Sequence, residues 1–455
     1  MSTHTEPRDT SAVGKNPPKT NAIGAAMRFL TVLTGSDIAD RFGLREPINR
    51  VAYQGTKSGF QTLGAASRAF KSVQGGGSPK RLSTPGKDYF NIAPDDEQKM
   101  IADTAREFSE EILRPAAHDA DEAATAPAEL LTRFAELGIT TINVPEEFDG
   151  AASERGVVTN GLVAEAMSYG DMGLAIPLLA PSGVATTLTQ YGSDAQQKTY
   201  LPDYAGENVP QSSVIIAEPR ALFDAFDIKT KATRAPSGYK LDGVKSFVPA
   251  AGSSELFVIG ANLDGRPALF LVEADTEGLI IEADPGMGVR AAGMGRVVLN
   301  NVSVPKSALL GEEEGDAAFA AYRDVVRLAR LGWSSLAVGT SQAVLDYVVP
   351  YVNDRVAFGE PVSNRQGVAF PVAVMATELD ALRLVTQRGT SRAEQGLSYA
   401  REAALARKLV SDKGMQIGSD GVQLLGGHGF TKEHPVERWY RDLRAASIGE
   451  GIVVL

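Results

Sequence analysis

The chain has 455 residues, of which 43% are hydrophobic and 22% charged, and its formal net charge is −11. This composition is typical of a globular protein with several domains, and the negative net charge argues against the clustered basic face that binds nucleic acid. The absence of cysteine excludes disulfide frameworks, thiolate metal sites and cysteine nucleophiles. The four histidines have no metal-binding spacing, so we expect no metal. Without an evident transmembrane segment or signal peptide, we expect a cytoplasmic protein.

The N-terminal part differs in character from the rest of the chain. Residues 1–20 are polar and contain prolines, which predicts a disordered tail. Residues 21–87 form a predicted extension, with apolar residues at helical spacing up to residue 73 and then a Gly- and Pro-rich linker. We expect this extension to dock on the protein's own oligomer, or alternatively to bind a partner or a membrane surface.

Residues 88–211 are predicted to form a helical domain. Asp95 or Asp96 can cap its first helix, and Pro115 is expected to end that helix because proline lacks a backbone N–H. Gly and Pro residues separate the later segments. Further helices are expected at about 127–137, 155–169 and 184–191.

The pattern becomes alternating at about residue 212, which predicts a β-domain over 212–314 that is antiparallel and barrel-like. From about 315 to 455 the pattern is helical again, which predicts a bundle domain. The fold class is therefore α+β, in the order helical domain, β-domain, helical bundle. The expected strands are 213–217, 239–248, 256–260, 268–272, 297–299 and 302–305, and the expected bundle helices are 316–352, 366–391 and 398–418.

Six blocks follow one another along the chain: Leu137–Gly150, Gly192–Pro202, Ala217–Pro219, Val304–Gly311, Arg355–Gly359 and Gln423–Gly451. Together they resemble the acyl-CoA dehydrogenase family, in the same order, over about residues 88–451. That resemblance implies a helical domain, a middle β-domain and a C-terminal four-helix bundle. It also implies that FAD binds between the β-domain and the bundle, and that the protein is a homodimer or homotetramer.

The resemblance implies that Glu450 is the catalytic base. Desaturation of an acyl thioester needs a base for the α-proton and a hydride acceptor for the β-carbon, and a flavin supplies the second. Glu450 follows Gln423 by 450 − 423 = 27 positions, which is the family spacing. Some family members carry the base on the first bundle helix, but here that segment, Arg327–Arg330, has no carboxylate.

The resemblance assigns the remaining site residues to the cofactor and the substrate. Arg330 is expected to face the CoA part of the substrate or to form a structural ion pair, and Gly449 to line the substrate pocket. A neighbouring subunit's FAD is expected to contact Arg355 and Phe358. The full set implied for FAD is Ile216, Ala217, Phe223, Phe247, Val248, Pro249, Arg355, Phe358, Gln366, Gln423, Gly426 and Gly427.

The flavin-facing side departs from the family pattern. Ala217 stands where the family has Thr, Leu222 and Phe223 replace a Gly-Ser pair, and Pro249 removes both a hydroxyl and a backbone N–H. Each lost hydrogen bond costs about 0.5–1.5 kcal/mol, so FAD binding is expected to be weaker. Gly449 replaces an aromatic residue, which predicts a wider pocket. Family members also continue with another helix, which is absent here or lies beyond the given sequence.

The function implied by the resemblance is FAD-dependent α,β-dehydrogenation of a fatty or otherwise bulky acyl-CoA, with electrons passed to an electron-transferring flavoprotein. Two alternatives remain. One is a flavin oxidase or monooxygenase of the same fold, although those monooxygenases lack the base carboxylate. The other is a non-catalytic scaffold subunit, which the altered residues at 217–224 and 247–250 suggest.

Overall fold

The computed structural model describes residues 94–455 except 153–154 and 207. The predicted tail, 1–20, and all of the predicted extension, 21–87, lie outside the described residues.

The first described domain is helical, as predicted, and Asp95 caps its first helix. The Asp95 carboxylate accepts the backbone N–H of Gln98 at 2.8 Å, and the Gln98 side chain accepts the Asp95 N–H at 3.2 Å. This reciprocal pair satisfies two donors that the first helical turn leaves free. The helices are α4 (Asp96–Phe108), α5 (Arg114–Ala123), α6 (Ala128–Glu136), α7 (Val157–Gly170), α8 (Met172–Tyr191) and α9 (Asp194–Ala205).

The expectation that Pro115 ends the first helix is wrong. A π-turn, η1 (Ser109–Leu113), carries the chain from α4 into α5 without a break. Pro115 lies in the first turn of α5. The wider turn accommodates the missing N–H and the pyrrolidine ring, which an uninterrupted α-helix would not.

Helix α8 is a core helix. It is long and apolar enough to cross a membrane, but 94% of its most apolar window is buried inside the protein. Asp171 caps it by accepting the N–H of Leu174 at 3.0 Å. Since the helix contacts α7, α9 and β1, its uniformly apolar surface is explained by packing on all sides.

The middle domain is a seven-stranded sheet with the order β1-β4-β2-β3-β7-β6, and β5 pairs with β4. The prediction of a wholly antiparallel sheet is wrong, because β1 and β2 both pair with β4 in parallel. The long connection between β1 and β4 makes the β1–β4 crossover possible. The strands are β1 (Ser212–Ile215), β2 (Lys231–Ala235), β3 (Gly238–Val248), β4 (Leu256–Leu263), β5 (Arg266–Glu273), β6 (Leu279–Ala283) and β7 (Gly295–Pro305).

Strand β7 unites two segments that were expected to be separate strands, 297–299 and 302–305. It pairs with β3 along its length, and a register shift lies between Leu241 and Gly243. Asn301 has a φ of 52° at the same place. The polar Asn300–Asn301 pair therefore marks a β-bulge, which bends a strand without ending it.

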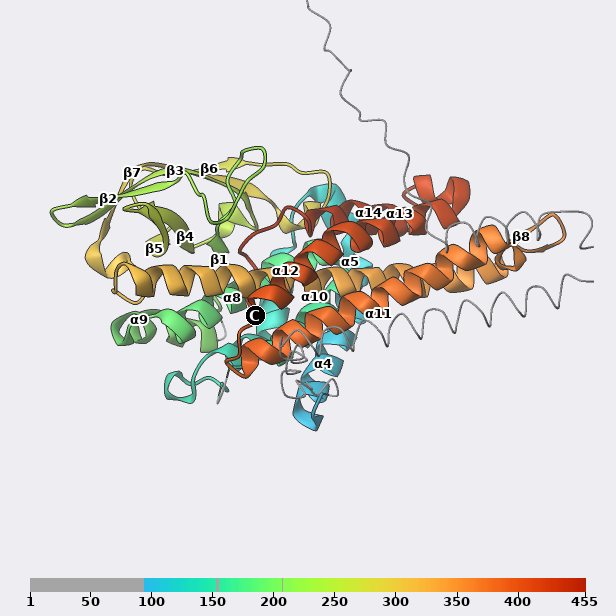
Figure 1. Ribbon diagram of the computed structural model, residues 1–455, viewed down its shortest axis with the longest axis horizontal. Helices are drawn as coiled ribbons and strands as arrows, with labels where there is room; N and C mark the ends of the chain where they lie inside the picture. The colour runs from blue at the N-terminus through green and yellow to red at the C-terminus, as the bar shows by residue number, and fades with distance from the viewer. Residues whose placement is uncertain (1–93, 153–154, 207) are drawn as a thin grey trace, which may run out of the picture. The chain divides into compact units, whose positions relative to one another are not determined.

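The third domain is a helical bundle, as predicted, and its long helix α10 links the domains. In Figure 1, α10 extends beside the sheet and continues into the bundle next to α11. Two short strands, β8 (Val356–Ala357) and β9 (Glu360–Pro361), connect α10 to α11. The helices are α10 (Asp316–Asp354), α11 (Gln366–Glu394), α12 (Ala400–Leu409), α13 (Met415–Leu424) and α14 (Val436–Ala445), with a π-turn, η8 (Val410–Gly414), between α12 and α13.

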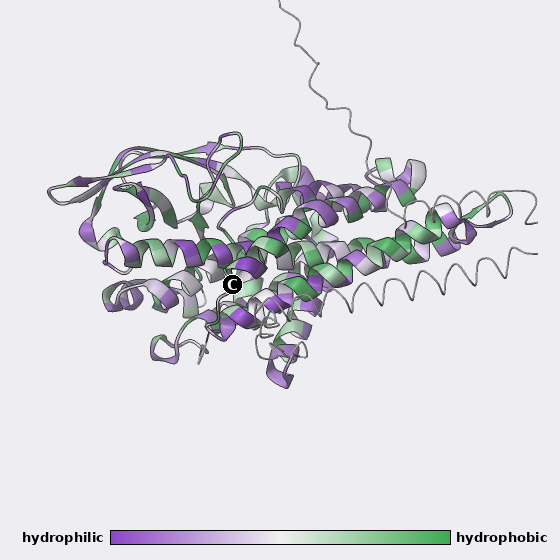
Figure 2. Ribbon diagram, viewed as in Figure 1, coloured by the Kyte–Doolittle hydropathy of each residue, from purple (hydrophilic) through white to green (hydrophobic). Residues whose placement is uncertain are grey.

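Helices α10 and α7 are in close contact at Gly339. A Cβ atom at this position would lie 2.0 Å from the Glu165 carbonyl oxygen and 2.3 Å from Ser168 Oγ. Figure 2 shows mixed colouring along α10, with green, hydrophobic segments where it enters the bundle and purple on the exposed start of α4. The helical domain and the bundle thus share one core, and α10 lies at its centre.

Candidate active site

The predicted site residues form two groups at separate places along α10. Arg330 belongs to the first group and Arg355 to the second, and the 25 positions between them (355 − 330) correspond to about 37 Å of helix. The first group is Ile216, Ala217, Phe223, Phe247, Val248, Pro249, Arg330, Gly449 and Glu450, and the second is Arg355, Phe358, Gln366, Gln423, Gly426 and Gly427.

Glu450 is buried, with 6% of its surface exposed, and two arginines bind its carboxylate. Arg330 donates from Nη2 to Oε1 at 2.7 Å and from Nε to both oxygens at 3.0–3.1 Å. Arg407, on α12, places Nη2 3.4 Å from Oε1. Of the two expectations for Arg330, the ion pair is therefore what the structure contains. Arg407 was missed because it lies 43 positions before Glu450 (450 − 407) on another helix.

The backbone around Glu450 is attached to the edge of the sheet. Ile452 donates its N–H to Val214 O at 2.7 Å, and Gly451 forms a β-bridge with Ile215. Gly451 has a φ of 82°, which glycine adopts without strain. These contacts fix the carboxylate-bearing segment between strand β1 and helix α10.

Trp333 on α10 fills the space that Gly449 leaves. A Cβ atom at residue 449 would lie 2.2 Å from Trp333 Cε2. The indole is fully buried and donates its Nε1–H to Gly451 O at 3.1 Å. The expected widening of the pocket at Gly449 is therefore wrong, because an aromatic ring from another element occupies the volume.

We expect Gly449→Ala to lower the free energy of unfolding by about 1–3 kcal/mol, the usual cost of overpacking. The new methyl group would overlap the buried indole, so the ring or the backbone of residue 449 must move. Urea unfolding followed by circular dichroism measures it. The double variant Gly449→Ala with Trp333→Phe should regain part of the lost stability, and equal losses in both variants would show that the ring is not the obstacle.

Phe247 stacks on Trp333, with ring centroids 5.8 Å apart and an interplanar angle of 30°. Phe247 and Ala250 both have positive φ, 60° and 45°. Non-glycine residues adopt this conformation at a cost, and such residues cluster at functional sites. The segment Phe247–Ala250, which includes the buried Pro249, is thus held in a strained conformation beside α10.

A buried ion pair supports the end of strand β1. Lys245 is fully buried, and its Nζ donates to Glu218 Oε1 at 3.2 Å and to Ile216 O at 3.1 Å. Burial lowers the pKa of Lys245 to about 8, and the nearby Glu218 opposes this effect. Ser246 also donates its N–H to Ala217 O at 3.0 Å. These bonds fix Ile216 and Ala217, and sequence patterns had given no role to Lys245.

The loop after Ala217 carries Phe223 and is more exposed. Leu222 is 99% exposed and Phe226 is 36% exposed. Phe226 lies under the Arg330 guanidinium at 5.5 Å.

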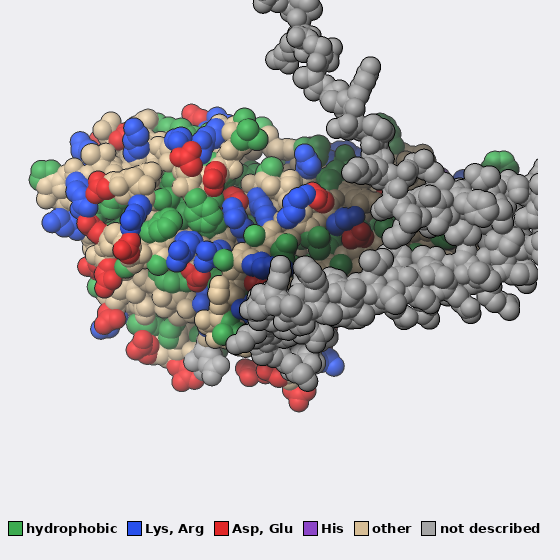
Figure 3. Space-filling view, viewed as in Figure 1, with side chains coloured by type: hydrophobic (Ala, Val, Ile, Leu, Met, Phe, Trp, Pro, Cys, Tyr) green, Lys and Arg blue, Asp and Glu red, His purple; other side chains and the backbone are tan. Residues whose placement is uncertain are grey.

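Burial, with the negative charge of Glu450, raises the pKa of Tyr322 well above its usual range, so its hydroxyl stays protonated and donates to Ala225 O. Figure 3 shows hydrophobic side chains with Lys and Arg around them on the visible face, between the sheet and the helices.

The second group lies around a groove of about 630 Å³ at the far part of α10. Arg355, Gln423, Gly426 and Gly427 line it together. Among the described residues, none beyond the chain neighbours places an atom within 4 Å of a Cβ built on Gly426 or Gly427, so this backbone is open to a ligand. Two predicted residues lie outside the lining: Phe358, which is 94% exposed, and Gln366, which begins α11.

The comparisons with known proteins agree with this architecture. Family models describe the acyl-CoA dehydrogenase N-terminal domain, which matches residues 95–208, the middle domain, which matches 213–302, and the C-terminal domain, which matches 319–452. The three matched domains are those of a family of flavin-dependent oxidoreductases. The chain belongs to the acyl-CoA dehydrogenase family.

Individual relatives support the same assignment. The mitochondrial short/branched chain specific acyl-CoA dehydrogenase of Bos taurus is 31% identical over 363 residues, which cover 78% of this chain and 83% of that protein. The structure of butyryl-CoA dehydrogenase from Megasphaera elsdenii superimposes with a TM-score of 0.72 at 28% identity, covering 80% of this chain and 96% of that one. A glutaryl-CoA dehydrogenase from Mycobacterium smegmatis, in complex with FADH2, gives a TM-score of 0.70 at 25% identity, covering 78% and 90%.

FAD is the cofactor of this family, as the sequence predicted, and the residues of this chain fit it at the second group. Gly426 and Gly427 leave the backbone open, and Arg355 brings a guanidinium into the same groove; guanidinium binds phosphate oxygens in pairs. At the first group, Phe247 and Trp333 stack directly on each other. A flavin ring would have to lie beside these two stacked rings, or the rings would have to separate to admit it.

Proposed function

We propose that the protein dehydrogenates a fatty or otherwise bulky acyl-CoA between Cα and Cβ, with Glu450 as the base for the α-proton. The observation that carries this proposal is the buried Glu450 carboxylate at the junction of β1 and α10, next to the Phe247–Trp333 ring pair. When bound, FAD supplies the hydride acceptor for the β-carbon. We further propose that an electron-transferring flavoprotein takes the electrons.

Arg330 and Arg407 determine when Glu450 can act. A base must offer a lone pair to the proton that it removes, at hydrogen-bond distance. The Arg330 guanidinium contacts both carboxylate oxygens. Proton removal therefore requires the carboxylate to turn away from at least one of these bonds. The acyl thioester, with its negative charge developing at the carbonyl oxygen, is a group that could take up the released guanidinium.

We propose that one FAD contacts both groups of site residues, and that the two groups then come from different subunits. Arg330 and Arg355 are separated by about 37 Å along one helix, which exceeds the length of a dinucleotide. Residues near Glu450 would hold the flavin ring in one subunit. Arg355, Gln423, Gly426 and Gly427 of a second copy would bind the rest, which supports a homodimer or a homotetramer.

We expect the purified protein, after incubation with FAD, to show a flavin spectrum that is bleached anaerobically by a long-chain or branched acyl-CoA. Bleaching reports the transfer of hydride to the flavin, and addition of an electron-transferring flavoprotein should restore the yellow form. Free CoA is the control, because it lacks the acyl Cα–Cβ bond and should leave the spectrum unchanged.

Three results would contradict the proposal. Protein that takes up no FAD favours the non-catalytic alternative. This alternative is worth testing because Phe247 and Trp333 stack directly on each other, where a flavin ring would have to lie beside them or separate them. Flavin that binds but is not bleached by any acyl-CoA excludes the dehydrogenase reaction. Rapid reoxidation by oxygen instead of by the flavoprotein would favour the oxidase alternative.

A further inference from the structure

Three non-glycine residues with left-handed backbone lie in two neighbouring loops. They are Phe247 with φ 60°, Ala250 with φ 45° and Val289 with φ 49°. This conformation is especially unfavourable for a β-branched residue such as valine. Strained residues persist only where their surroundings hold them, so contacts that restrain both loops must exist.

The two loops are bonded to each other at both ends of the segment Phe247–Ala250. Asp284 Oδ2 accepts the Phe247 N–H at 3.1 Å, and Ala292 O accepts the Ala250 N–H at 2.8 Å. We call Asp284–Ala292 the supporting loop. A shift of the supporting loop would therefore displace the segment that carries Phe247 and its stacking partner Trp333.

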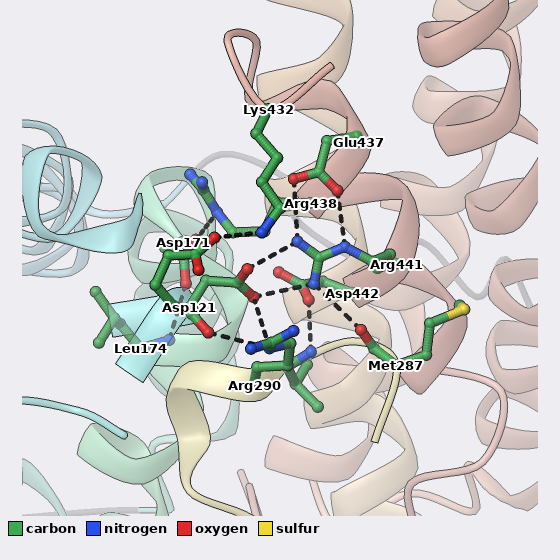
Figure 4. A network of polar contacts seen from close by, with 12 residues as sticks. Asp121, Asp171, Leu174, Met287, Arg290, Lys432, Glu437, Arg438, Arg441 and Asp442 are labelled. Atoms are coloured by element: carbon green, nitrogen blue, oxygen red, sulfur yellow. Dashed lines mark hydrogen bonds and ion pairs between the residues drawn. The ribbon is translucent and has the colours of Figure 1, made fainter. Parts of the chain in front are cut away.

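Helix α14 holds the supporting loop from the other side, as Figure 4 shows. Asp442 Oδ1 accepts the Val289 N–H at 2.5 Å, and Arg441 Nη1 donates to Met287 O at 3.1 Å. Gly288 lies so close to α14 that a Cβ on it would be 2.1 Å from Arg441 O. The loop and the helix thus meet backbone to backbone.

The other charged groups in Figure 4 are paired away from Asp442. Arg438 donates from Nε to Asp171 Oδ2 at 2.9 Å, and Arg441 binds Asp121 at 2.9–3.0 Å. Burial raises the pKa of Asp442 to about 8, and the charge of Asp171 acts in the same direction. Asp442 Oδ1 accepts one backbone N–H, a role that the side-chain oxygen of an asparagine can reproduce.

We propose that Asp442 is a positioning residue that, through Val289 and the supporting loop, holds Phe247 against Trp333. Asp442 does not reach the reacting atoms. The proposal rests on the proposed function only in that Phe247–Ala250 faces the flavin. The contacts that link Asp442 to Phe247 exist in the protein without a cofactor.

Intrinsic fluorescence of the protein without FAD tests the proposal directly. The chain has two tryptophans, so in a Trp439→Phe background the emission comes from Trp333 alone. We expect Asp442→Ala to shift that emission to longer wavelength and to increase quenching by acrylamide, because the segment Phe247–Ala250 loosens. Asp442→Asn should leave both unchanged. Asp420→Ala, on the neighbouring α13, is the matched control.

FAD affinity supplies a second measurement. Loss of one buried hydrogen bond that holds the loop should weaken FAD by about tenfold in Asp442→Ala, with Asp442→Asn close to the parent. If the parent binds no FAD, the proposed function fails, while the emission experiment still decides this proposal.

One outcome contradicts the proposal, and a second variant is available if Asp442→Ala does not fold. Unchanged emission in a folded Asp442→Ala protein would overturn the proposal. If that variant does not fold, Gly288→Ala decides in the same assay, because it pushes the supporting loop from α14 while Asp442 stays in place; native emission there would equally overturn it.

Discussion

Glu450→Gln is expected to lower the rate of flavin reduction by an acyl-CoA about 10²–10⁴-fold, the range that a positioned base contributes, while FAD stays bound. The amide has nearly the same shape as the carboxylate but cannot accept the α-proton. Anaerobic stopped-flow measurement of flavin bleaching gives the rate, and flavin absorbance at rest gives the occupancy.

Stability must be measured alongside, because Glu450 is also the partner of two buried arginines. Removing one partner of a buried ion pair costs about 3–5 kcal/mol, and glutamine retains one oxygen acceptor for Arg330. Glu433→Gln, on the exposed loop before α14, is the control and should behave as the parent. A parent-like rate of bleaching in Glu450→Gln would show that another group removes the proton.

Gly339→Ala is expected to have the largest effect on folding. The new methyl group would lie 2.0 Å from the Glu165 carbonyl oxygen, and neither backbone can yield without separating α10 from α7. Overpacking usually costs about 1–3 kcal/mol, and we expect a loss at or above the upper end. Guanidinium unfolding curves measure it through the transition midpoint.

Gly414→Ala is the matched control for this prediction. Gly414 is also a buried glycine in a helical segment, but the nearest atom to a Cβ there is Leu443 Cδ2 at 3.7 Å, an ordinary contact. Alanine is favoured over glycine in helices by about 1 kcal/mol, so this variant should be as stable as the parent or more so. Equal losses in both variants would mean that the α7–α10 contact has room.

Much of the fold could be predicted because its signals are local. Hydrophobic period, capping and turn residues predict the order of the three domains. They also predict that α10 begins at Asp316 and that α11 begins at Gln366. The parallel pairing of β1 with β4 could not, because period-two alternation does not encode the direction of the neighbouring strand. Pro115 was misread because a π-turn has no distinctive sequence signal.

The candidate site was predictable only in part, for a similar reason. Glu450 and the glycines before it lie in one continuous block, so their position could be recognised. Arg407, Trp333 and Lys245 act through partners that are distant in the sequence and close only in the folded chain. A small residue at 449 predicts a gap only if nothing else fills it, and the large residue that does so lies 449 − 333 = 116 positions earlier.

The fit between Trp333 and Gly449 also limits how this protein could have changed over time. An aromatic side chain restored at position 449 would collide with the indole, and loss of the indole alone would leave a cavity beside Phe247. Either single substitution is therefore disfavoured, although the exchange of both together could be neutral, since effects at contacting positions are not additive. The two positions are thus expected to be inherited as a unit, and lineages should carry one large residue at either place and seldom at both.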